Sequence, residues 1–173
     1  MSSKLMTIGV LTIACLVASA VLLPTAGHAQ DTRVKAAMEN LKSKAEKLGP
    51  PKLEGMDKVA GKEVPAIYFG TTKQNNNFAL VDEVAGETGA TATIFVKSGD
   101  DFVRVATNVK KDDGSRAVGT VLDPKGKAIQ SLIKNEPFYG DVDILGKHYT
   151  AGYEPIRDSM KKVIGIYYVG YKK

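Results

Sequence analysis

Two spacings of hydrophobic residues divide the sequence between helices and strands. Apolar residues recur every three or four positions over residues 31–48, which predicts an amphipathic helix that ends at Gly49-Pro50. The same spacing predicts two short helices, over residues 78–88 and 128–135. The apolar stripe of the first helix can pack on its own domain or pair with a second copy, and the spacing favours neither.

Alternating apolar residues predict five strands in the second half of the chain. They cover residues 91–97, 102–109, 138–145, 148–156 and 163–171. Turn residues between consecutive strands, such as Ser98-Gly99 and Gly146-Lys147, predict antiparallel hairpins.

The segment between the first two helices is less regular. Residues 64–69 predict a short strand or an extended lead-in, whereas residues 52–63 and 70–77 are rich in glycine or asparagine and predict loops.

The order of these elements predicts an α+β domain with a five-stranded antiparallel sheet. Several strands, such as residues 163–169, are apolar on both faces, so we expect both faces of the sheet to be covered. The long helix would cover one face. The loops and short helices would cover the other and leave a pocket there.

Residues 103–122 combine strand, turn and polar side chains in one stretch. A strand pattern is followed by the turn pair Asp113-Gly114 and then by a small segment with Arg116 and Gly119. Two arginines and several hydroxyl or amide side chains are thereby brought near an apolar strand. The stretch can hold a small anion, or it can be a hairpin with solvated charges, and its spacing alone favours the hairpin.

The first thirty residues differ in composition from the rest. Lys4 precedes an apolar run over residues 5–23, Pro24 interrupts it, and Gly27-His28-Ala29 resembles a cleavage site. We therefore predict a signal peptide over residues 1–29, cleavage after Ala29, and an exported domain over residues 30–173. The alternative is an uncleaved anchor in the inner membrane, because the run is nearly long enough to span a bilayer.

Charge and cysteine content exclude several functions. The net charge of +5 is scattered, without an arginine-rich run, so we predict no nucleic-acid partner. Cys15 is the sole cysteine and precedes the predicted cleavage site. The exported domain would then have no disulfide, no thiolate metal site and no covalently attached haem, and with His148 as its one histidine we predict no metal or cofactor.

Four ordered strings carry a resemblance to a known family. They are FALVDEV with TGATATIF (residues 78–84 and 88–95), RVATNV with DGSRAVGT (104–109 and 113–120), GDVDILGK with YEPIRD (140–147 and 153–158), and KVIGIYYVG (162–170). Together they resemble the single Cache domain, a PAS-like extracellular sensor of bacterial chemoreceptors and sensor kinases. The resemblance covers residues 35–173.

The resemblance implies a PAS-like pocket for a small metabolite, often a carboxylate. Family members usually continue into a second transmembrane helix and a cytoplasmic module, whereas this chain stops at Lys173, so we expect a free-standing exported sensor domain. The relatives that carry haem use a Cys-x-x-Cys-His motif, which the predicted exported domain lacks.

The resemblance also implies ligand-binding residues. In similar citrate-type sensors an arginine and the residue three positions later hold the ligand carboxylates, and these positions correspond to Arg104 and Thr107. Arginine suits the role because its planar guanidinium can bind a carboxylate through two hydrogen bonds. The further candidates are Asn108, Arg116, Thr120, Tyr149 and Tyr153, with Lys147 as a weaker one.

Each candidate also has a structural alternative. Arg104 can pair with an acidic residue on a neighbouring strand, and Arg116 can be a solvated turn residue. Thr107 and Asn108 can satisfy the backbone at the strand end. Tyr149 and Tyr153 share a strand face, where they can be core residues or pocket walls, while His148 points the other way.

Two functions follow from these observations. The first is a non-catalytic module that binds a small organic anion outside the cytoplasmic membrane for a membrane receptor or sensor kinase. The second is an interaction protein with a closed pocket, which forms a homodimer or docks on a receptor through its N-terminal helix. We expect no enzymatic activity, because the sequence shows no nucleophile with a matching base.

Overall fold

A computed structural model of the protein describes residues 26–173, with side chains from residue 31 onward. Residues 1–25, which carry most of the predicted signal peptide and Cys15, lie outside the described residues. Within the described range, no helix is both long enough and apolar enough to cross a membrane.

The predicted N-terminal helix is confirmed as α1, Ala26–Leu48, which begins five residues before the predicted start. Its apolar stripe, including Val34, Met38 and Leu41, is buried against strands of its own domain. The helix ends where Gly49 approaches Gly70 so closely that a Cβ on Gly49 would lie 2.7 Å from the Gly70 Cα. The stripe is therefore covered within the domain, and only polar, charged and small side chains and the half-exposed Leu48 face outward.

The loop predicted for residues 52–63 is wrong, because this segment forms most of a β-hairpin. Strands β1 (Pro51–Val59) and β2 (Lys62–Phe69) pair antiparallel, and the short β3 (Thr72–Lys73) completes a three-stranded sheet in the order β1-β2-β3. The hairpin packs on the main domain through buried residues of β2 such as Ile67 and Phe69.

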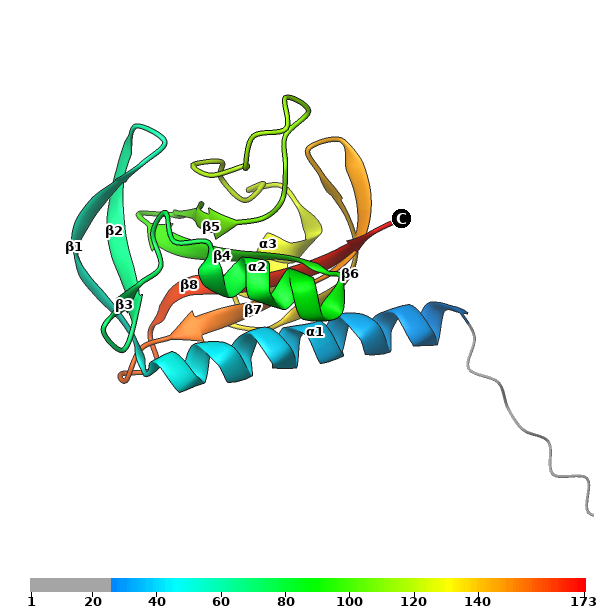
Figure 1. Ribbon diagram of the computed structural model, residues 1–173, viewed down its shortest axis with the longest axis horizontal. Coiled ribbons are helices and arrows are strands. Elements are labelled where there is room, and N and C mark those ends of the chain that lie inside the picture. The colour runs from blue at the N-terminus through cyan, green and yellow to red at the C-terminus, as the bar shows by residue number, and fades with distance from the viewer. Residues whose placement is uncertain (1–25) are drawn as a thin grey trace, which may run out of the picture.

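The predicted five-stranded antiparallel sheet is confirmed. Its strands are β4 (Thr91–Ser98), β5 (Asp101–Thr107), β6 (Phe138–Ile144), β7 (Lys147–Arg157) and β8 (Val163–Lys172). They are arranged in the order β5-β4-β8-β7-β6, with antiparallel pairing throughout. The chain thus has the predicted α+β architecture (Figure 1).

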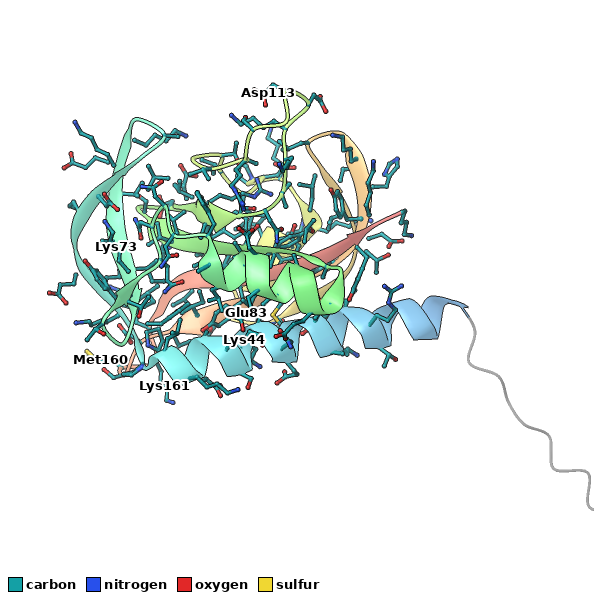
Figure 2. The ribbon with its side chains drawn as sticks, in the orientation of Figure 1. Lys44, Lys73, Glu83, Asp113, Met160 and Lys161 are labelled. Carbon is teal, nitrogen blue, oxygen red and sulfur yellow. The ribbon has the colours of Figure 1, made fainter. Side chains whose placement is uncertain are left out.

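One face of this sheet, which we call the helix face, is covered by two helices. Helix α2 (Ala79–Thr88) lies beside α1, and its Leu80, Val81 and Val84 join the same buried cluster (Figure 1). Lys44 of α1 and Glu83 of α2 point toward each other and form an ion pair (Figure 2). Our expectation that the short helices cover the pocket face is therefore wrong for α2.

The opposite face, which we call the cavity face, carries a separate aromatic cluster. Phe95, Tyr153 and Tyr168 are buried there, together with residues of the short helix α3 (Lys127–Leu132). Residues 108–126 connect β5 to α3 across this side of the molecule (Figure 1). Because this face is covered by a loop and one short helix, it is where a cavity can form.

Candidate functional site

Residues 103–122 fold back on themselves, as the hairpin interpretation predicts, but its solvated charges are wrong, because Arg104 is buried and Arg116 pairs with Asp82. The returning segment pairs with β5 through a bridge between Val103 and Val121, and Thr120 accepts a hydrogen bond from the Arg104 main-chain N–H at 2.9 Å. The turn at its tip is closed by Asp113, whose carboxylate accepts the Ser115 N–H at 2.8 Å. The returning segment covers the outer edge of β5 and places Thr120 beside Arg104.

A β-bulge orients the two residues that the resemblance singles out. Phe95 pairs with Arg104 and Thr93 pairs with Thr107, while the register shifts between the two pairs. The shift leaves Val105 as an extra residue, so Arg104 and Thr107 lie on the same face although they are three positions apart. That face is the cavity face, because Phe95 belongs to its aromatic cluster.

Arg104 is a buried cation with few partners. Its side chain donates from Nη1 to the Thr120 Oγ1 at 2.7 Å, and its guanidinium carbon lies 5.0 Å from the centre of the Phe95 ring. The residue is 4% exposed, its Nε has no hydrogen-bond partner, and none of the described residues pairs it with a carboxylate. Burial lowers the pKa of Arg104 from its usual value, but an arginine remains charged in proteins.

A cavity of about 400 Å³ opens on the cavity face, between α3 and the β6–β7 hairpin. Its lining residues are Leu122, Asp123, Lys125–Ala128, Asp141–Asp143, His148, Tyr149, Tyr153 and Lys173. Of the predicted ligand residues, Tyr149 and Tyr153 line it directly. Arg104 does not line the cavity itself, but it contacts Phe95, which belongs to the same buried cluster as Tyr149 and Tyr153. The size is at the lower end of the range for small-molecule sites.

The two tyrosines combine an apolar wall with free hydrogen-bond donors. Tyr153 packs against Tyr168 with ring centres 4.9 Å apart, and against Phe138 at 6.2 Å. Within the described part of the chain, neither the Tyr149 nor the Tyr153 hydroxyl has a hydrogen-bond partner. Burial raises the pKa of Tyr153, so its hydroxyl stays protonated and can donate to an anion.

Thr107 and Asn108 use their side chains within the protein. The Thr107 hydroxyl lies 2.6 Å from that of Thr93 and accepts the Val109 N–H at 3.1 Å. Asn108 donates to the Val81 carbonyl at 2.7 Å and accepts the Ala92 N–H at 2.8 Å. Both therefore satisfy the backbone at the end of β5, as their structural alternative states, and neither lines the cavity.

Arg116 and Lys147 are likewise held by protein carboxylates. Arg116 forms a two-pronged ion pair with Asp82, at 2.7 and 2.8 Å, and lies over the ring of Phe78. It fastens the returning segment to α2 rather than being a solvated turn residue. Lys147 pairs with Asp112 at 2.8 Å, outside the cavity.

The charged side chains at the mouth of the cavity were not among our candidates. Lys173 pairs with Asp141 at 2.7 Å, and the exposed His148 pairs with Asp143. The sequence did hold a hint for residues 123–126, because they lie between the stretch with the two arginines and the next predicted helix. Among the described residues, no three histidine, cysteine or acidic side chains converge as metal ligands would.

Comparison with known proteins identifies the family. The profile of the Cache 3/Cache 2 fusion domain matches residues 22–173, which is nearly the whole chain. A search of the curated proteins found no match. Cache domains are typically extracellular or periplasmic sensing domains for small molecules, and they are generally non-catalytic. Their fold agrees with the helix and five-stranded sheet seen here, and this chain belongs to the Cache 3/Cache 2 fusion domain family.

Proposed function

We propose that this protein binds a small organic anion in the cavity on the cavity face and that Arg104 neutralises the ligand's charge. The observation that carries the proposal is the arginine itself: a buried guanidinium without a carboxylate partner costs free energy, about 1–3 kcal/mol for an unsatisfied buried group. Such a cost is tolerated at a site where a ligand supplies the missing acceptor.

The tyrosines complete the proposed site. Their hydroxyls add neutral donors at the inner wall, and Thr120 holds the guanidinium while the site is empty. Tyr149 and Tyr153 line the cavity, and Arg104 contacts Phe95 of the same buried cluster. A ligand carboxylate would reach the guanidinium after a rotation of one ring, a side-chain change that is common on binding.

The proposal also states where the protein acts and which kind of protein detects it. Export across the cytoplasmic membrane follows from the predicted signal peptide and accords with the usual location of the family. A membrane receptor or sensor kinase would then detect the loaded domain. The alternative function, a homodimer or receptor docking through the N-terminal helix, has less support, because the apolar stripe of α1 packs on the domain's own sheet.

Thermal unfolding against a panel of carboxylates tests the proposal. A ligand that binds only the folded protein raises its melting temperature, by several degrees well above saturation. We expect the shift to disappear in Arg104→Gln. Arg157→Gln is the matched control, because Arg157 is held by Asn135 away from the cavity. A shift that survives in Arg104→Gln would refute the role of this arginine, and a panel without any shift would refute the function.

A further inference from the structure

The charged side chains that line the cavity include equal numbers of aspartates and lysines, and Arg104 nearby adds one further positive charge. Three aspartates and three lysines line it: Asp123, Asp141, Asp143, Lys125, Lys127 and Lys173. His148 is counted as neutral here, as in the formal net charge of the chain. Arg104, buried against Phe95 of the same aromatic cluster, therefore adds a single positive charge, which one carboxylate would neutralise.

The mouth offers little to a second carboxylate. Lys173 is already paired with Asp141. Lys125 and Lys127 are exposed, where water and salt screen their charges. Asp123 lies beside them, equally exposed and with its carboxylate in no ion pair within the described part of the chain, so its charge offsets theirs and leaves no net attraction for a second negative group.

The inner wall favours a planar body. Tyr153 belongs to a row of rings, with Phe138 on one side and Tyr168 on the other, and Tyr149 adds another ring to the cavity wall. An aromatic ligand would extend this row, and offset or tilted ring pairs are attractive beyond the area that they bury.

We propose that the site selects monocarboxylates with an aromatic body over dicarboxylates of the same skeleton. This inference rests on the proposed function and specifies its ligand. The carboxylate would contact Arg104 and a tyrosine hydroxyl, and the ring would pack along Tyr149 and Tyr153. A second carboxylate would gain no free buried cation, because the remaining cations of the lining are paired or exposed.

Titration calorimetry with three matched acids tests the inference on the whole protein. The probes are 3-phenylpropionate, phenylsuccinate, which adds one carboxylate, and 3-cyclohexylpropionate, which saturates the ring. We expect phenylpropionate to bind at least about tenfold more tightly than phenylsuccinate, and a few-fold more tightly than the cyclohexyl acid.

The variant Asp123→Asn sharpens the test. Asparagine keeps the side-chain oxygen that accepts the Lys125 N–H at 2.9 Å but removes the charge. It should strengthen the binding of phenylsuccinate more than that of phenylpropionate, because only the dicarboxylate brings a second negative charge to the mouth. Equal or tighter binding of phenylsuccinate by the natural protein would overturn the inference while the proposed function stands. Equal affinities for phenylpropionate and the cyclohexyl acid would overturn the preference for an aromatic ligand. If no acid binds and the carboxylate panel gives no shift in melting temperature, both the inference and the proposed function are overturned.

Discussion

Two polar side chains on opposite faces of the five-stranded sheet, Glu154 and Arg104, differ in how many partners they have. On the helix face Glu154 accepts the Tyr139 hydroxyl at 2.6 Å and pairs with Lys42 of α1 at 3.0 Å. On the cavity face Arg104 has one side-chain hydrogen bond, to Thr120, and a buried Nε without a partner. A polar group whose hydrogen bonds are all made within the protein stabilises the fold, whereas a polar group with an unused donor can bind a ligand. Asn40 of α1 also has a buried side-chain oxygen without a partner, but it is uncharged, so the comparison favours Arg104 as the binding residue and the Glu154 network as a stabilising one.

The largest effect that separates the faces is expected from Leu41→Ala. Leu41 is fully buried between α1 and the sheet, so its truncation leaves a cavity and should lower the free energy of unfolding by about 2–5 kcal/mol. The affinity of the folded protein for an acid of the panel should not change. Urea unfolding and calorimetry measure the two quantities.

Ile133→Ala is the control for this truncation, because Ile133 is 72% exposed and its change should stay within about 0.5 kcal/mol. A Leu41→Ala variant that loses affinity in proportion to its stability would show that the helix face is not separate from the site.

A smaller effect is expected from Glu154→Leu. The substitution leaves the Tyr139 hydroxyl and the Lys42 ammonium without their shared acceptor, and it should cost about 1–2 kcal/mol, because water can partly reach Lys42. The double variant Glu154→Leu with Tyr139→Phe should cost less than the two single changes added together, since each removes the same hydrogen bond. Additive losses in urea unfolding would contradict the network.

The strands of the main sheet were predictable from the sequence, whereas the first hairpin was not. Alternation identifies a strand when one of its faces is buried, and β4, β5, β7 and β8 bury most of their residues. In β1 five successive residues, 52–56, are exposed, including Leu53 and Met56. A strand that buries so little carries no period-two signal, so its pattern resembles a loop.

The candidate site was predictable only in part, because its candidates depend on distant partners. Arg116 binds Asp82, 34 positions away, and Asn108 binds the carbonyl of Val81, 27 positions away. No local pattern reveals such pairs. Simple alternation also places Arg104 and Thr107 on opposite faces, and the bulge in β5 that reunites them follows from pairing rather than from composition.

The smallest effect, with opposite sign, is expected from Arg104→Met. Methionine has a similar length and no charge, so it removes the buried guanidinium and its unpartnered Nε while keeping contact with Phe95. We expect the empty protein to become more stable by about 1 kcal/mol, which corresponds to about 3 °C in melting temperature for a domain of this size. Binding of carboxylates should be lost at the same time. A residue kept for function shows this combination, since a stabilising substitution commonly removes activity. A structural arginine would give the reverse result, because loss of its bond to Thr120 and its contact with the Phe95 ring would lower the melting temperature.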